Sequence, residues 1–263
     1  MNTNTIKNIG IIICAAVFAA AIIYSATKFR DADCVDIKIN IKDTLIVNFI
    51  DDNDVLDMIY FITPNIKGCK MAEINLDEME SYLRKQPFIR HADVYKTVNG
   101  ILKIDIVQRH PIVEIITNSN NSFYIDEEGT IFPFNANGNA PNVLTANGFI
   151  PDKYDFSQNK IYNIYYEDIN NSRESEIFRL ARLINKDEFW NDQVEQIYVN
   201  KDKEFEIVPL VGPDILELGS IENYDQKLHD LKAFFQMGLK KTGWDTYKKI
   251  SVKFNGQIVC QRQ

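Results

Sequence analysis

The sequence predicts an α+β protein with a single transmembrane helix, a small β-α-α-β-β domain and a larger strand-rich domain. Three observations predict this class. Residues 8–27 carry no charge. Residues 35–108 switch between period-two and helical apolar patterns in the order strand, helix, helix, strand, strand. From residue 109 onward most apolar runs are short and bounded by turn residues, with two helical patterns among them.

The uncharged segment has the length of a membrane anchor. It covers about 20 residues between Lys7 and Lys28, enough for a helix to cross a hydrocarbon core. A cleaved signal peptide is the alternative, but the apolar run continues past the small residues Ala19–Ala21, which favours a retained anchor. Basic residues flank both ends, so charge alone leaves the orientation open. We expect a tail at residues 1–8, the helix at 9–27 and a stalk at 28–34.

The small domain begins with a strand and two helices. Apolar and polar residues alternate from Val35 to Ile41, the period of a half-buried strand. The acidic cluster Asp51–Asp54 is typical of a helix start, and Asn75–Glu78 resembles the capping box of a second helix. Pro64 and Pro87 end the two helices.

A hairpin closes the small domain. Strands at residues 88–98 and 101–108 are joined by Asn99-Gly100, a strong signal for a tight turn. The small domain therefore covers residues 35–108, and the second domain covers residues 109–263 without a flexible linker between them.

The second domain contains several short strands and two longer helices. We expect the helices at residues 173–190 and 224–241, where apolar residues recur on one face. The expected strands lie at residues 112–117, 122–125, 130–134, 143–145, 194–200, 204–210, 215–218, 249–254 and 257–261. The last two form a terminal hairpin around Asn255-Gly256, and the final strand has no successor to cover it.

Composition excludes some classes of function. The net charge of −8 argues against a nucleic-acid partner, because phosphate binding needs a cationic surface. The cysteines and histidines lack the spacing of a metal site, so we predict no metal and no cofactor. A Cys34–Cys69 disulfide is compatible with an oxidising compartment, but the sequence does not decide it.

The best candidates for catalysis are Asp126, Glu127 and Glu128, since paired carboxylates hydrolyse glycosides. Neighbouring residues in a tight turn point in different directions, however, and solvated turn carboxylates are the simpler interpretation. We predict that the protein is not an enzyme. An anchored envelope hydrolase using this cluster is the alternative, and a pocket of convergent carboxylates would favour it.

Three stretches lie in this order behind the anchor: Gln86–Val94, at the end of the second helix; Leu102–Ile112, a strand followed by Arg-x-Pro; and Phe123–Phe132, with a Tyr-Ile-Asp-x-x-Gly hairpin. Together they resemble the bacterial cell-division family FtsQ/DivIB. The resemblance implies a POTRA domain followed by the family's β domain. It also implies a body outside the cytoplasmic membrane at the division septum, and a scaffold that binds FtsB and FtsL and regulates septal wall synthesis.

The resemblance further implies that the terminal hairpin binds FtsB by strand addition. An exposed edge strand can accept a partner strand through backbone hydrogen bonds. Ser251 stands where the family often has Asp. Val259→Pro removes a donor and is expected to abolish FtsB binding while leaving the fold largely intact. The implied partner-binding residues are Tyr247, Ser251, Lys253, Phe254, Asn255, Gly256, Gln257, Ile258, Val259, Cys260 and Gln261.

A POTRA protein of outer-membrane assembly is a third interpretation. Such proteins usually carry several POTRA repeats or a long run of barrel strands, and this sequence shows neither pattern.

Overall fold

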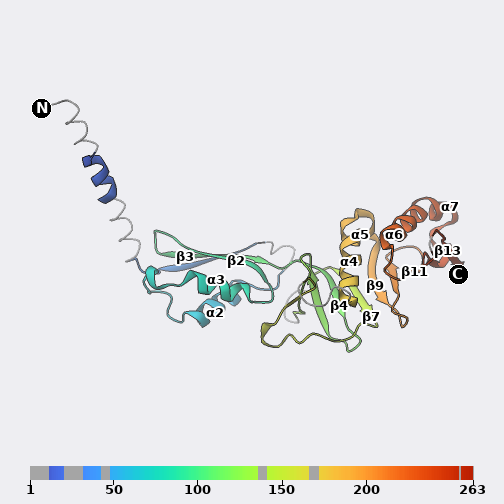
Figure 1. Ribbon diagram of the computed structural model, residues 1–263, viewed down its shortest axis with the longest axis horizontal. Helices are drawn as coiled ribbons and strands as arrows, with labels where there is room; N and C mark the ends of the chain where they lie inside the picture. The colour runs from blue at the N-terminus through green and yellow to red at the C-terminus, as the bar shows by residue number, and fades with distance from the viewer. Residues whose placement is uncertain are drawn as a thin grey trace, which may run out of the picture. The chain divides into compact units, whose positions relative to one another are not determined.

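The computed structural model describes residues 12–20, 32–42, 48–135, 141–165, 172–254 and 256–262 (Figure 1). Residues 12–20 are helical, and the remainder of the predicted span at 9–27 lies outside the described residues. Within the described part of the chain, no helix is both long and apolar enough to cross a bilayer. Contacts divide the chain into two compact units, Met1–Gln108 and Arg109–Gln263.

The first unit contains a three-stranded sheet. Its strands β1 (Asp36–Lys42), β2 (Ile89–Lys96) and β3 (Ile101–Gln108) lie in the order β1-β3-β2. β3 is central, parallel to β1 and antiparallel to β2. Alternate residues of β3 are buried, as the period of two predicts, and they include Leu102, Ile104 and Ile106.

Two helices, α2 (Asp52–Ile62) and α3 (Leu76–Arg84), complete this core. Asp51 caps α2 in a capping box: its carboxylate accepts from Asn53 N and Asp54 N, and the Asp54 side chain accepts from Asp51 N. The acidic cluster is therefore a helix start, as predicted. α3 packs mainly on β2 and buries Met79 and Leu83.

The second unit is built on a ten-stranded mixed sheet. Its order is β13-β12-β11-β10-β9-β7-β4-β5-β6-β8. The pairs β4–β7, β7–β9 and β11–β12 are parallel, and the others are antiparallel. The strands are β4 (Pro111–Ile116), β5 (Ser122–Asp126), β6 (Thr130–Pro133), β7 (Leu144–Gly148), β8 (Tyr162–Asn163), β9 (Val194–Val199), β10 (Phe205–Pro209), β11 (Ile215–Gly219), β12 (Tyr247–Ser251) and β13 (Val259–Arg262).

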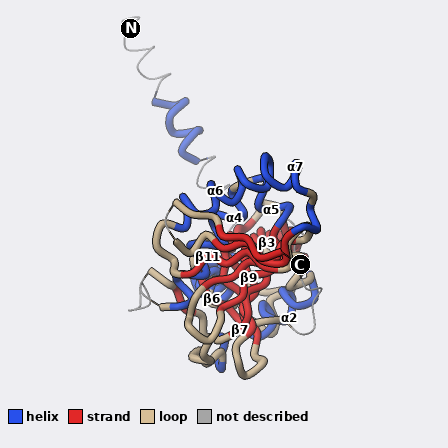
Figure 2. The backbone as a smooth tube through the Cα atoms, turned by 90° about the vertical axis from the view of Figure 1, so that its right-hand side faces the viewer, coloured by secondary structure: helices blue, strands red, loops and turns tan. Residues whose placement is uncertain are grey.

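The helices α4 (Arg173–Lys186), α5 (Glu188–Gln193), α6 (Tyr224–Ala233) and α7 (Lys240–Thr242) lie together on one side of the strands β9 and β11 (Figure 2). Apolar residues of α4 and α6 join the core formed by the sheet, among them Ile177, Leu180, Leu228 and Leu231. The amphipathic patterns seen in the sequence therefore identify the faces that cover the sheet.

Both long helices are interrupted, which the sequence patterns did not predict. The predicted helix at 173–190 is wrong as a single element, because Asp187 has an extended backbone and separates α4 from α5. Its carboxylate caps α5 by accepting from Phe189 N and Trp190 N. The predicted helix at 224–241 includes a π-helical segment, η3 (Phe234–Leu239), between α6 and α7.

Candidate functional site

The candidate site is the terminal hairpin, where β13 forms one end of the sheet order. Both strands are shorter than predicted, and pairing runs from Ser251 opposite Val259 to Tyr247 opposite Arg262. Gln257 N donates to Phe254 O at 3.2 Å and closes the turn. Of the predicted site residues, Lys253, Phe254, Gly256, Gln257 and Ile258 lie in the connection rather than in a strand, and Asn255 lies outside the described residues.

The hairpin is held to the sheet from its inner side. β12 is parallel to β11, and the helical segment from α6 to α7 forms the crossover between them. Ile250 and Val252 are buried in the core, and Cys260 packs against it while remaining half-buried. Burial raises the pKa of the Cys260 thiol. The inner face of the hairpin is therefore fixed by packing.

Backbone hydrogen bonds show which way β12 directs its polar groups. Asp214 N donates to Lys248 O, and Val252 N donates to Glu217 O, each at 2.9 Å. Lys248 and Val252 thus direct these groups toward β11. Because successive residues of a strand direct their backbone groups to opposite sides, those of Ser251 point toward β13.

This alternation identifies the backbone N–H group of β13 that points away from β12. Ser251 lies opposite Val259, so the N–H and C=O of Val259 point into the hairpin. The N–H and C=O of Cys260 therefore point to the other side, where no strand of the described residues pairs with β13. The expectation for Val259→Pro changes accordingly, since that substitution removes a donor of the hairpin itself.

Ion pairs on the strand surface tie the hairpin to its neighbours. Lys253 Nζ lies 2.5 Å from Glu204 Oε1, and Lys249 Nζ lies 3.0 Å from Glu217 Oε1. The hydrogen bond to Glu204 raises the pKa of Lys253. Burial acts to raise the pKa of Glu217, but hydrogen bonds from Ser251 and Lys249 outweigh it and lower this pKa.

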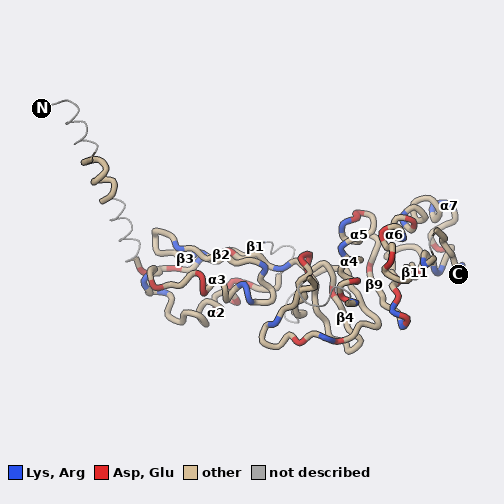
Figure 3. Tube along the Cα trace, in the orientation of Figure 1, with Lys and Arg blue, Asp and Glu red and all other residues tan. Residues whose placement is uncertain are grey.

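The exposed side chains of the hairpin are mainly apolar and basic. Phe254, Ile258 and Val259 are 59%, 37% and 51% exposed. Residues 247–262 contain four basic residues and no acidic one. Within the described residues, Lys248 and Arg262 have no ion-pair partner, whereas acidic and basic positions are interspersed elsewhere in this unit (Figure 3). The edge is thus suited to an extended segment with apolar and acidic side chains.

The carboxylates predicted as an alternative catalytic site are not brought together. Asp126 is 1% exposed, and its Oδ2 accepts from Arg109 Nη1 at 2.8 Å. Its Oδ1 accepts from the backbone N–H of Thr130 and of Glu128. Glu127 and Glu128 are exposed in the turn between β5 and β6. Asp126 therefore serves as a structural anchor of this hairpin, and the geometry does not favour a hydrolase.

The matches to known families fall within the two structural units, one in each. A sequence profile described as "FtsQ/DivIB, C-terminal related" matches residues 110–261, and a POTRA-like domain profile matches residues 32–107. The chain belongs to the FtsQ/DivIB family. No curated protein matches the sequence. Membership associates the chain with the divisome and with a scaffold rather than an enzyme.

The sequence did not reveal how the FtsQ/DivIB motifs contact one another. Arg109 belongs to the Arg-x-Pro stretch and Asp126 to the Tyr-Ile-Asp-x-x-Gly hairpin, and the two side chains form the buried pair. The opposite charges within the two motifs were a signal that could have suggested this pair. The ion pairs of Lys249 and Lys253 had no such signal, because their partners Glu217 and Glu204 are far away in sequence.

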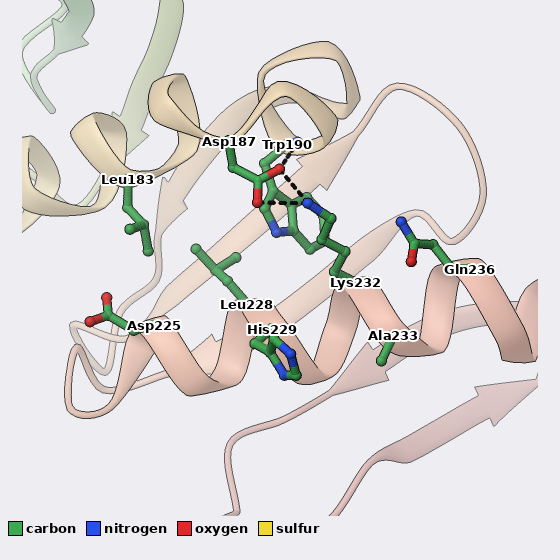
Figure 4. Close-up of a pocket in the computed structure, with 9 residues that line it drawn as sticks. All are labelled: Leu183, Asp187, Trp190, Asp225, Leu228, His229, Lys232, Ala233 and Gln236. Carbon is green, nitrogen blue, oxygen red and sulfur yellow. Dashed lines mark hydrogen bonds and ion pairs between the residues drawn. The ribbon is translucent and has the colours of Figure 1, made fainter.

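A separate cavity of about 320 Å³ lies between α4, α5 and α6 of this FtsQ/DivIB protein (Figure 4). Lys232 Nζ reaches both carboxylate oxygens of Asp187 at 2.7 Å, and Trp190 lies beside the pair. Asp187 and Lys232 thus neutralise each other, and the pair joins the start of α5 to α6.

Proposed function

We propose that the protein is a non-enzymatic, membrane-anchored scaffold of the divisome that binds FtsB- and FtsL-type partners by strand addition to β13. One observation carries the proposal: β13 is the outermost strand, and Cys260 directs its N–H and C=O away from β12. An added strand would satisfy these groups, and backbone hydrogen bonds of this kind do not depend on the partner's side chains.

Side chains beside the edge supply the specificity. The exposed Phe254 and Val259 give a partner strand apolar contacts, and Lys248 and Arg262 attract acidic side chains. Lys249 and Lys253 are already paired with glutamates, so they hold the hairpin in place instead. The partner segment is therefore expected to be extended, amphipathic and acidic.

The proposed location follows from the uncharged segment at residues 8–27. We propose that residues 9–27 anchor the chain in the cytoplasmic membrane, with the short tail inside and both units outside. Its length supports this, because about 20 apolar residues span a hydrocarbon core. At the septum, the scaffold would recruit and regulate the wall-synthesis proteins, with the POTRA-like unit contacting other divisome members.

A pair of proline variants tests strand addition. Cys260→Pro removes the outward N–H, and proline is tolerated on an edge strand when its nitrogen faces solvent. We expect this variant to bind a purified FtsB-type partner about tenfold more weakly or worse, as expected for the loss of a backbone hydrogen bond. Cys260→Ala controls for the half-buried side chain and should bind as the wild type does.

Tryptophan emission separates binding from folding in this experiment. Both tryptophans, Trp190 and Trp244, belong to the second unit, so their emission reports its unfolding alone. Val259→Pro should shift this unfolding transition, because it breaks the hairpin, whereas Cys260→Pro should leave it nearly unchanged. A folded Cys260→Pro variant with wild-type affinity would exclude strand addition at this edge.

A further inference from the structure

Two cysteines of the POTRA-like unit lie on paired backbone segments. Asp33 and Lys70 form an antiparallel bridge, which joins the segment entering β1 to the connection between α2 and α3. Cys34 N donates to Cys69 O at 2.8 Å, beside this bridge. Gly68 N donates to Cys34 O at 2.8 Å, so that Gly68 and Cys69 together lie opposite Cys34 in a β-bulge.

The ion pair of the bridge shows which side chains share a face. Lys70 Nζ lies 2.7 Å from Asp33 Oδ1, so these two side chains are on the same side of the paired segments. Successive side chains of an extended segment alternate between its two sides. Cys34 and Cys69, each next to one member of the ion pair, therefore both lie on the opposite side.

We infer that Cys34 and Cys69 form a disulfide when the protein meets an oxidising thiol–disulfide environment. Residues opposite each other in such a pair have Cα atoms about 5.5 Å apart, within the range that a disulfide bridges. In this structure both thiols are free. Cys69 Sγ donates to Asn65 O at 2.9 Å, so closing the bond requires a rotation of the Cys69 side chain.

The difference in burial between the two thiols determines which one reacts first with the oxidant. Cys69 is partly exposed, whereas Cys34 is 1% exposed and burial raises the pKa of its thiol. The Cys69 thiolate attacks a small disulfide donor such as oxidised glutathione and releases one donor thiolate. Cys34 then loses its proton and attacks Cys69 Sγ, which releases the second donor thiolate. Two protein thiols are oxidised and one donor disulfide is reduced.

The bond would secure the entry of the chain into the POTRA-like unit. It closes a loop that contains β1 and α2, and it adds a covalent link to the hydrogen bonds at this point. Closing a loop of about 35 residues restricts the unfolded chain substantially. The presence of the bond in cells rests on the proposed function, which puts this unit outside the cytoplasm, where disulfides persist.

Counting thiols in the purified full-length chain tests the chemistry apart from its location. The protein is equilibrated with a mixture of reduced and oxidised glutathione, in which reduced glutathione reverses the mixed disulfides of single thiols. It is then denatured and alkylated with a maleimide, and its mass is measured. Of the four cysteines, we expect two to be alkylated before reduction and four after it, with a linked peptide pair containing Cys34 and Cys69. Cys34→Ser and Cys69→Ser should each leave three alkylated thiols, and Cys260→Ala one. Four alkylated thiols in the oxidised wild type would overturn the inference.

Hydrogen exchange gives a second measurement on the folded chain. Amides of β1 should exchange at least about tenfold more slowly in the oxidised wild type than in the Cys34→Ser/Cys69→Ser variant, since the bond opposes opening. Equal exchange rates in the two proteins would show that no Cys34–Cys69 disulfide restrains β1. The same thiol count, made on cells quenched with acid, shows whether the disulfide is present in cells. A disulfide that forms with glutathione but is absent in cells would contradict the proposed location outside the cytoplasm, and it would still support the pairing of Cys34 with Cys69.

Discussion

Arg109 Nη1 lies 2.8 Å from Asp126 Oδ2, and both residues are buried, at 7% and 1% exposure. Arg109 also donates to Thr130 Oγ1 at 3.2 Å, while Thr130 N donates to Asp126 Oδ1. These contacts connect the start of the second unit to the β5–β6 hairpin. Two motifs that carry the family resemblance are thus two halves of one buried network.

Asp126→Asn should destabilise the second unit by about 3 kcal/mol. The asparagine keeps the shape, but it loses the charge that compensates Arg109, and an unpaired buried charge is costly. Tryptophan emission during urea unfolding measures this change, because it follows the second unit only. Glu127→Gln, at the exposed neighbour, is the matched control. Equal stability of Asp126→Asn and wild type would contradict a structural role for the pair.

Asp187 should make the stability of the second unit depend on acidity. The hydrogen bond from Lys232 lowers the pKa of Asp187, although burial acts against it. A lowered folded-state pKa means that the stabilisation is present above the unfolded value of about 3.9 and is lost as the pH falls through the folded value. Because Asp187 is about one-third exposed, solvent screening keeps the contribution small.

Two substitutions at this position separate the charge from the helix cap. Asp187→Asn keeps an acceptor for Phe189 N and Trp190 N, so we expect it to remove the part of the pH dependence below about pH 4 that Asp187 contributes, with little other change. Asp187→Ala also loses the cap and should cost about 1 kcal/mol more. Trp190, on the capped helix, reports both changes by fluorescence. An Asn variant with the pH profile of the wild type would exclude Asp187 as the titrating group.

Sequence patterns located most elements because each pattern reflects a local constraint. The capping box at Asp51 and the alternation in β3 depend on neighbouring residues, and both are present as expected. The break at Asp187 was missed, because the helical pattern continues across it and its partner Lys232 lies on another helix. The parallel pairing of β11 with β12 was missed for the same reason, since their register depends on the helices between them.

At the terminal hairpin too, the sequence pattern could not predict features that depend on contacts between residues far apart in sequence. The pattern identified the terminal hairpin and its edge, but it could not tell which donors face outward. That assignment depends on the bonds of Lys248 and Val252 to β11, which are contacts between strands distant in sequence. The structure therefore moves the decisive donor from Val259 to Cys260.

Gly148→Ala should destabilise the second unit strongly, by at least about 2 kcal/mol. Gly148 ends β7 with φ +106°, and an added Cβ would overlap the carbonyl oxygen of Val199 on β9. Gly256→Ala is the control, because its φ is also positive at +71° but its Cβ would meet nothing within 4 Å. The control should lose only about 1 kcal/mol from backbone strain. Urea unfolding compares the two, and equal losses would contradict the close approach of β7 and β9.

Reversing the charge of exposed basic residues of the terminal hairpin should weaken partner binding without unfolding the protein. Lys248→Glu and Arg262→Glu replace exposed cations that have no ion-pair partner among the described residues, so the fold should tolerate them. If the partner segment is acidic, each reversal should slow association, and the loss should shrink as salt is raised from 50 to about 500 mM. Lys186→Glu, an exposed reversal on α4, controls for net charge. If the binding kinetics change equally in all three variants, the electrostatic attraction of the partner is general rather than local to β13. If the kinetics of the two hairpin variants are unchanged, an acidic partner at this edge is excluded.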